Sequence, residues 1–309
     1  PTRQWVYPPG VYAGADGSVT MRWGRHEAEW SCGLFTGDAA VRSRGGSLPA
    51  AAARGAGTLG LLAAAAAVAG GQAAHVRRRY GSAAPDVPSH IEATVSPTGA
   101  ARTDETPIEL AVLGDSSVAG VGVTGVDDTL PVQVAQRVAD RSGRTVHVVG
   151  HGRSGATTQD VLVHQVAAVR TTPDAVVLVV GTNDLTPLGA LGRTTAQLFA
   201  ELTADGSPLV VSSLPEFRAM RVLPNPLMAA ARSYAGLVHL VQTRAAGRND
   251  LVRFVDVRRA VGWEFVDDAS TMSADRFHPS AAGYGRIADA LAPSVLAMLR
   301  TKRSMGART

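Results

Sequence analysis

The sequence has almost no cysteine and almost no lysine. Of its 309 residues, Cys32 is the only cysteine and Lys302 is the only lysine. A single cysteine excludes a disulfide framework and any zinc site built from several cysteines. Since arginine supplies the remaining positive charge, codon usage explains the lysine shortage better than a phosphate-binding role does. Neither a collagen period nor a heptad period is present, which excludes fibrous and coiled-coil proteins.

Charged residues are also scarce, at 18% of the chain, and their distribution argues against nucleic-acid binding. Residues 105–299 hold 16 Arg and 19 acidic residues, a balance of −3, whereas 1–104 and the tail from Arg300 are basic. No basic face interleaved with aromatic residues stands out in the acidic stretch, so nucleic acid is not an expected partner. The hydrophobic fraction of 45% is enough for a sizeable core and excludes wholesale disorder.

The chain divides into several segments before its main domain. Residues 1–54 show no sustained period and begin without methionine, so we interpret them as disordered or as lying upstream of the true start. The segment 55–80 consists of an uncharged, Ala-rich stretch over 55–74 and a basic flank. The segment 81–106 is rich in Pro, Ser, Thr and Ala, which predicts a linker.

Two interpretations of the uncharged stretch over 55–74 stay open. As a helix, 20 residues span the hydrocarbon core of about 30 Å, which predicts a membrane anchor or an uncleaved signal. The alternative is an Ala-rich linker helix that stays outside lipid. We expect the anchor, and with it membrane association and a membrane-anchored or exported protein. Three arginines flank each side of the stretch, so the positive-inside rule selects no orientation.

From Pro107 onward, apolar runs of strand length alternate with segments of helix length. The strands are predicted at 108–113, 146–149, 175–180, 209–213 and 251–257, and the helices at 129–142, 158–170, 194–204, 227–246 and 280–300. Continuous Val and Leu runs are typical of parallel strands covered on both faces. Residues 107–300 therefore predict an α/β domain, a three-layer α/β/α sandwich with a central parallel five-stranded sheet, followed by a basic tail at 301–309.

Four polar segments lie where this topology would place a site. Three follow predicted strands and one precedes the last helix: Gly114-Asp115-Ser116-Ser117, the loop 150–157 (GHGRSGAT), Gly181-Thr182-Asn183-Asp184, and Asp275-Arg276-Phe277-His278-Pro279. Ligands of open α/β sheets bind at the carboxyl ends of the strands. We therefore expect the four segments to converge on one edge of the sheet.

The residue types in these segments support acyl transfer through a serine nucleophile. A serine hydroxyl is a weak nucleophile until an imidazole takes its proton. His278 is able to do this for Ser116, and Asp275, three residues earlier, is able to hold the imidazole in the required tautomer. The candidate donors to the developing oxyanion are the backbone N–H groups of Ser116 and Gly155 and the side-chain amide of Asn183.

In their order and separation, the four segments resemble the SGNH (GDSL-type) hydrolase superfamily. The four letters match Ser116, Gly155, Asn183 and His278, and Asp275 completes a triad. The resemblance implies a flavodoxin-like fold and a serine esterase or lipase that works through an acyl-enzyme, with no cofactor. The apolar segment and linker resemble, more loosely, the N-terminally anchored bacterial members.

The family pattern is not matched everywhere. Many members carry Asn at the position of Gly150, a departure that concerns the support of the loop rather than the oxyanion donors.

Three further residues are candidates for substrate binding. His151 lies in the second polar segment, and Asp115 and Asp184 are neighbours of Ser116 and Asn183. Each aspartate is alternatively a hydrogen-bonding residue of its loop. No pair of histidines has metal-ligand spacing with an acid nearby, so no metal site is expected. Residues 120–125 fit G-x-G-x-x-G but do not open a helix directly after a strand, so nucleotide binding is not expected.

The sequence thus predicts a carboxylic ester hydrolase that acts on a small-molecule or lipid acyl ester. Two alternatives stay open. An acyltransferase that moves the acyl group to a sugar or glycerol hydroxyl would use the same triad, and a non-catalytic binding module would keep the fold without the chemistry. No oligomeric state is predicted.

Overall fold

The computed structural model divides into two compact units, residues 1–64 and 65–309. It describes residues 11–13, 18–23, 26–32, 39–43, 67–68, 70–72, 75, 90–99, 106–169, 172–184 and 188–306. Most of the predicted anchor at 55–74 lies outside the described residues. In the described ranges, no helix has both the length and the hydrophobicity that crossing a bilayer requires.

Four strands form an antiparallel sheet in the first unit. They pair in chain order: β1 (Val11–Ala13), β2 (Ser18–Trp23), β3 (His26–Cys32) and β4 (Ala39–Ser43). The expectation of disorder over 1–54 is not met at these strands. Residues 18–23 alternate polar and apolar types, which is the pattern of a strand, but runs of 3 to 7 residues are too short to show a sustained period.

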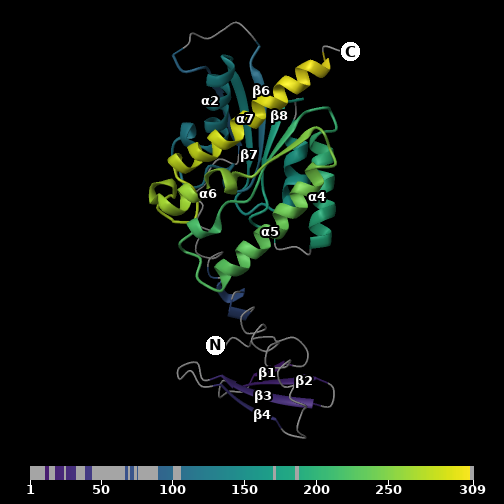
Figure 1. Ribbon diagram of the computed structural model, residues 1–309, viewed down its shortest axis with the longest axis vertical. Coiled ribbons are helices and arrows are strands. Elements are labelled where there is room, and N and C mark those ends of the chain that lie inside the picture. Colours follow the sequence, from purple (N-terminus) through teal and green to yellow (C-terminus); the bar gives the residue numbers. More distant parts are fainter. Residues whose placement is uncertain are drawn as a thin grey trace. The chain divides into compact units, whose positions relative to one another are not determined.

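Six strands form the central sheet of the second unit, in the order β10-β9-β8-β6-β7-β5. They are β5 (His90–Val95), β6 (Ile108–Gly114), β7 (Val146–Gly152), β8 (Ala175–Val179), β9 (Leu209–Ser212) and β10 (Val252–Val255). The five strands from β6 to β10 are parallel, and helices cover the sheet (Figure 1). The predicted α/β fold with a mostly parallel sheet is confirmed.

The sixth strand, β5, corrects the prediction of a five-stranded sheet and lies within the predicted linker 81–106. It pairs antiparallel with β7, from His90 opposite His151 to Val95 opposite Val146. The run alternates exposed and buried residues, with Ile91 buried, as expected of an edge strand with one open face. Six residues between Pro-rich stretches carry too weak a signal to be separated from a linker.

Helices form a layer on each face of the sheet. On one face lie α2 (Leu130–Ser142), α6 (Val257–Asp267) and α7 (Ala281–Gly306), and on the other lie α3 (Thr158–Asp160), α4 (Leu188–Leu202) and α5 (Leu227–Ala246). Within β6, Leu110 and Val112 belong to the core under α2 and α7, whereas Ala111 and Leu113 belong to the core under α4 and α5. The continuous apolar run is therefore two interleaved buried faces.

Some helix boundaries differ from those predicted. Helix α6 was not expected, and α7 continues to Gly306, so most of the predicted basic tail is helical. The predicted helix at 158–170 is one turn of α-helix followed by the π-helix Val161–Gln165 and the 3₁₀ turn Val166–Ala168. The end of the predicted anchor contacts α5, because the side chain of Gln72 accepts a hydrogen bond from Leu227 N–H at 3.1 Å.

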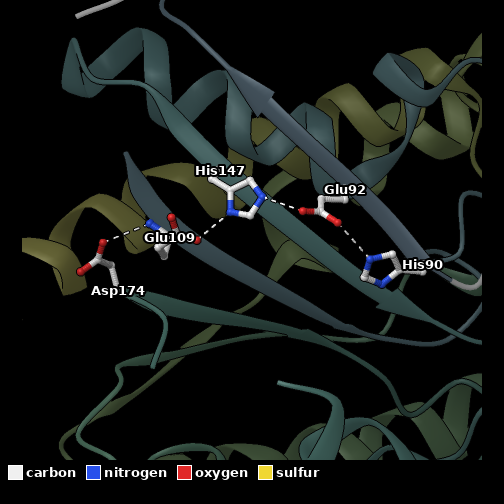
Figure 2. Close-up of polar contacts among 5 residues, drawn as sticks. All are labelled: His90, Glu92, Glu109, His147 and Asp174. Carbon is white, nitrogen blue, oxygen red and sulfur yellow. Dashed lines mark hydrogen bonds and ion pairs between the residues drawn. The ribbon is translucent and has the colours of Figure 1, made fainter. Parts of the chain in front are cut away.

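A chain of polar contacts ties β5 to the sheet (Figure 2). On β7, His147 Nδ1 lies 2.7 Å from Glu109 Oε2 of β6, and His147 Nε2 lies 3.1 Å from Glu92 Oε1 of β5. The other carboxylate oxygen of Glu92 lies 3.3 Å from His90 Nε2, and Asp174 accepts the backbone N–H of Glu109 at 3.0 Å. The imidazole of His147 thus bridges carboxylates on two different strands.

Candidate active site

Ser116 lies in a tight turn directly after β6. The N–H of Asp115 donates to Val179 O at 3.2 Å, and the N–H of Val118 donates back to Asp115 O at 3.2 Å. A Cβ at Gly114 would lie 2.0 Å from Val179 O, so only glycine allows β6 and β8 to approach this closely. The turn therefore holds Ser116 at the carboxyl edge of the sheet.

Buried Gln165 supports this turn from the face of the sheet that α4 and α5 cover. Its Oε1 accepts the N–H of Gly114 at 2.9 Å, and its Nε2 donates to the carbonyl of Gly114 at 2.8 Å. Gln165 is the last residue of the π-helix, in which Val166 N–H donates to Val161 O. π-turns of this kind are often found at functional sites. The Gln165 side chain thus forms hydrogen bonds with both the N–H and the carbonyl of Gly114, next to the serine turn.

Buried glutamines were missed by the sequence reasoning. Gln165 satisfies the end of β6, and Gln242 on α5 donates from Nε2 to Val180 O at 3.0 Å, just after β8. Both side chains are buried, at 6% and 2% exposure. A lone amide among apolar residues of a predicted helix is the signal that could have found them, because a buried amide needs hydrogen-bond partners.

The loop 273–278 carries the candidate acid and base. Oδ1 of Asp275 accepts hydrogen bonds from Ser273 Oγ at 2.7 Å, Phe277 N–H at 2.8 Å and His278 N–H at 2.9 Å. Arg276 has φ 57°, a left-handed conformation that is uncommon outside glycine and is found at functional sites. The turn leaves Oδ2 of Asp275 free to accept from the His278 ring.

The structure brings Ser116, His278 and Asp275 into one hydrogen-bonded chain. His278 Nδ1 lies 2.7 Å from Asp275 Oδ2, and His278 Nε2 lies 3.1 Å from Ser116 Oγ. A carboxylate only accepts hydrogen bonds, so Nδ1 is the donor and, in the neutral ring, Nε2 is the acceptor for the serine hydroxyl. This arrangement is able to remove the hydroxyl proton and place it on the ring.

Hydrogen bonds keep Asp275 in the carboxylate form. Partial burial on its own would raise the pKa of Asp275, but hydrogen bonds from the His278 ring and backbone, Ser273 and Phe277 outweigh this and hold the pKa well below its ordinary value. A permanently ionised partner favours the Nδ1–H tautomer of His278 and stabilises the ring when it becomes positive.

The candidate oxyanion donors lie on the loops that follow β7 and β8. Asn183 Nδ2 donates to Ala156 O at 3.0 Å, which fixes the amide and leaves its second N–H for a ligand. Gly155 has φ 77°, and among the described residues, apart from its chain neighbours, no atom lies within 4 Å of the position that a Cβ would take. Across the described ranges, the N–H groups of Ser116 and Gly155 have no hydrogen-bond acceptor. These donors are free to bind a negatively charged oxygen.

Asp115 is a buried carboxyl beside the candidate catalytic residues. It is 3% exposed, and its Oδ1 accepts the N–H of Ser117 at 3.0 Å. Burial raises the pKa of Asp115 to about 6, although the Ser117 hydrogen bond and the nearby His278 act in the opposite direction. Of the three predicted substrate-binding residues, Asp115 is the one that lines a cavity next to Ser116.

The other two predicted substrate-binding residues have partners elsewhere. Both carboxylate oxygens of Asp184 accept hydrogen bonds from Thr158, from its N–H at 2.9 Å and its hydroxyl at 2.5 Å. Asp184 therefore joins the loop after β8 to α3. His151 lies on β7, with its ring centroid 5.4 Å from that of His90, and it does not line the cavity. Burial lowers the pKa of His151.

A mostly apolar cavity of about 60 Å³ lies next to Ser116 and His278. Its walls come from the ends of β8 and β9, the loop after β9, α6, the residues on either side of His278, and α7. Ser116 and His278 thus lie beside a mostly apolar, partly open space between the sheet and the helices.

The fold and site define an α/β domain with a hydrogen-bonded serine, histidine and aspartate at the carboxyl edge of its sheet. The model of the GDSL-like Lipase/Acylhydrolase family matches residues 112–286. The chain belongs to this family.

Three known proteins are similar to parts of this chain. GDSL-like esterase Rv1075c of Mycobacterium tuberculosis (strain ATCC 25618 / H37Rv) is 30% identical over 190 residues, which cover 60% of this chain and 60% of that protein. The crystal structure of TesA superposes with a TM-score of 0.50 at 22% identity, over 62% of this chain and 99% of that chain. LAE5, an alpha/beta hydrolase enzyme from the metagenome of Lake Arreo, Spain, gives a TM-score of 0.49 at 20% identity, over 62% and 95%. The TesA structure supports the fold.

Proposed function

We propose that the chain is a serine esterase that hydrolyses acyl esters through an acyl-enzyme on Ser116. The observation that carries the proposal is the hydrogen-bonded chain from Asp275 through His278 to Ser116 Oγ, at 2.7 and 3.1 Å, beside an apolar cavity. Membership of the GDSL-like Lipase/Acylhydrolase family and the similarity to an esterase support the same class of reaction.

The proposed first half-reaction transfers the acyl group to the serine. Ser116 Oγ attacks the ester carbonyl carbon while its proton passes to Nε2 of His278, and Asp275 stabilises the charged ring. The oxyanion receives hydrogen bonds from the N–H groups of Ser116 and Gly155 and from the amide of Asn183. The intermediate then collapses, and the leaving alcohol takes the proton from Nε2.

The second half-reaction releases the acid. A water molecule attacks the acyl-enzyme carbonyl, and Nε2 of His278 takes its proton. When the second tetrahedral intermediate collapses, Ser116 Oγ regains that proton and the carboxylic acid leaves. No redox or metal-dependent step is needed, since the three side chains and water supply every proton and bond.

Hydrolysis of a p-nitrophenyl ester series by the full chain, compared with Ser116→Ala, tests the proposal. We expect turnover that the substitution abolishes, together with wild-type labelling by a serine-directed fluorophosphonate that Ser116→Ala prevents. Ser117→Ala is the matched control and should keep both properties. Turnover that survives in Ser116→Ala would disprove the nucleophile. Labelling without hydrolysis, with acyl transfer to an added glycerol or sugar, would favour an acyltransferase.

A further inference from the structure

We propose that a second cavity, at the edge of the sheet away from Ser116, binds an anion that carries an apolar chain, such as a fatty acid or an alkyl phosphate. This cavity is lined by residues from the end of α2, the start of β6 and the C-terminal half of α7. Its distance from Ser116, its apolar wall and its charged rim carry the inference, which does not rest on the proposed esterase function.

The second cavity is separate from the candidate active site. Ile108, the first residue of β6, lines it, whereas Asp115, directly after β6, lines the cavity beside Ser116. From residue 108 to residue 115 the chain advances by seven residues, which is about 23 Å of strand. A ligand of the second cavity would therefore be bound without contact to Ser116.

The inner wall of the second cavity is apolar. Ile108 and Leu299 are 2% and 7% exposed and belong to the core under α2 and α7, and Leu296 packs against that core. Small-molecule sites are typically lined by apolar side chains, with a few polar groups that fix the orientation of the ligand. An aliphatic chain against this wall would leave water without leaving a polar group unpaired.

Three arginines form the rim of the same cavity: Arg141 in the last turn of α2, Arg144 in the loop after it, and Arg300 on α7. Arg144 is held in place, because its Nη2 donates to Thr106 O at 2.7 Å and its N–H donates to Ser142 Oγ at 3.3 Å. No acidic residue is among the described residues that line the cavity. Since a guanidinium group binds a carboxylate or a phosphate through paired hydrogen bonds, this arginine rim suits an anionic head.

Nearby acids neutralise the arginine rim only in part. Arg141 Nη2 lies 3.6 Å from Asp289 Oδ1, but Arg137 Nε lies 3.1 Å from the same oxygen, so one carboxylate serves two guanidinium groups. In the part of the chain that the structure describes, Arg300 forms no ion pair. The rim therefore keeps positive charge that a bound anion would balance.

Stabilisation of a helix end does not explain the arginine rim. A basic residue in the last turn interacts favourably with the carbonyl end of a helix, which accounts for Arg141 on α2. Arg300 lies six residues before the end of α7 at Gly306, and this effect falls off within the last turn. Neither does it account for the apolar wall that the three arginines surround.

Calorimetric titration of the full chain with octyl phosphate tests the site, with inorganic phosphate and 1-octanol as reference ligands. Octyl phosphate should bind at least about tenfold more tightly than either reference, because each reference lacks the head or the chain. Octanoate, which offers a carboxylate on an apolar chain, should bind as well. An equal affinity for inorganic phosphate would exclude a role of the apolar wall, and an equal affinity for 1-octanol would exclude a role of the arginines; either result would overturn the proposal.

The double variant Arg141→Gln/Arg300→Gln assigns the binding to this cavity. It should bind octyl phosphate about tenfold more weakly than the wild type. Arg244→Gln/Arg248→Gln removes the same charge from two exposed positions outside the cavity and should bind like the wild type. Melting curves check that both variants fold. Wild-type affinity in the folded Arg141→Gln/Arg300→Gln variant would overturn the proposal, since binding beside Ser116 would give that result.

A free amphiphile and a lipid headgroup offer the same chemistry, and vesicles distinguish these two sources. Cosedimentation with phosphatidylglycerol vesicles that fails with phosphatidylcholine vesicles and is weakened in Arg141→Gln/Arg300→Gln would identify a lipid headgroup at the site. Arginine-dependent binding of octyl phosphate without such cosedimentation would identify a free amphiphile. Arginine-dependent binding by a protein that hydrolyses no ester would refute the esterase proposal and support this site.

Discussion

The Nδ1 atom of His278 lies 2.7 Å from Oδ2 of Asp275, while the same carboxylate receives three further hydrogen bonds at Oδ1. The loop 273–278 thus both fixes the carboxylate of Asp275 and positions the ring of His278. Since the carboxylate is fixed before any substrate binds, the orientation and tautomer of His278 are set by the fold.

Replacing Asp275 by asparagine should lower kcat by about 10⁴-fold. It should also lower the stability at neutral pH, because the folded state holds the pKa of Asp275 below its ordinary value and so favours the carboxylate. The amide keeps the shape of the side chain, but it is able to donate to Nδ1 and so favours the tautomer whose Nε2–H cannot take the serine proton. Steady-state kinetics with a p-nitrophenyl ester measure the effect, and a thermal melt checks the fold. Asp289→Asn, at a half-exposed site on α7, is the control. A loss of less than tenfold in Asp275→Asn would contradict the proposed role of the carboxylate.

Asn183→Ala should lower kcat by roughly 10²–10³-fold and leave KM nearly unchanged, because the amide acts on charge that develops in the transition state. The substitution also removes the hydrogen bond to Ala156 O, so a melting curve is needed alongside the kinetics. Thr194→Ala, on α4 and not among the residues that line the cavity, is the control. A rise in KM at constant kcat would show that Asn183 binds the substrate in the ground state and does not stabilise the oxyanion.

Several parts of the fold were predictable because their signals are local. The runs in β6 and β8 are apolar on both faces, and glycine and polar residues follow them directly, so strand position and chemistry coincide in the sequence. β5 was not predictable because its short alternating run lies between Pro-rich stretches. The π-helix that places Gln165 was also hidden, since one extra residue per turn leaves no mark in the hydrophobic period.

The candidate catalytic residues were easier to predict from the sequence than the contacts and the cavity around them. Ser116, Asn183 and His278 stand in segments whose order carries the resemblance, and the structure places these segments together. The partners of His151 and Asp184 depend on which strands and helices become neighbours. The cavity depends on side chains from six separate segments, so spacing along the chain contains no measure of its depth.

Asp115→Asn should stabilise the protein at neutral pH. Burial raises the pKa of Asp115 from 3.8 to about 6, so the folded state binds this proton more tightly than the unfolded state does. Ionisation of the Asp115 carboxyl therefore lowers the free energy of unfolding as pH rises from about 4 through 6. Above that range the loss reaches about 3 kcal/mol at most. Asparagine removes the titrating proton and retains an oxygen acceptor for Ser117 N–H.

Urea unfolding at several pH values measures this effect. The gain of Asp115→Asn over the wild type should be near zero at pH 4, grow through pH 6 and stay constant above pH 7. Asp250→Asn, at an exposed position, should show no such rise. A stability difference of Asp115→Asn that is independent of pH, or that falls as pH rises, would show that the buried carboxyl is not destabilised by its surroundings.

His147→Gln should weaken the attachment of β5 in a pH-dependent way. The hydrogen bond to Glu109, followed by that to Glu92, raises the pKa of His147 above 6.5, because both ring nitrogens face carboxylates and both donate only when the ring is charged (Figure 2). A raised pKa in the folded state means that the stabilisation is fully present below about pH 6.5 and is lost as pH rises through the folded-state value. The free energy of unfolding of the variant should therefore be lower than that of the wild type by about 0.5–1 kcal/mol at pH 5.5 and by less at pH 9, as measured by urea unfolding.

His164→Gln, at an exposed site, is the control for this measurement. Hydrogen exchange at the backbone N–H groups of Ile91 and Ala93 reports on β5 itself. An equal loss at both pH values would show that His147 contributes through packing rather than through its charge.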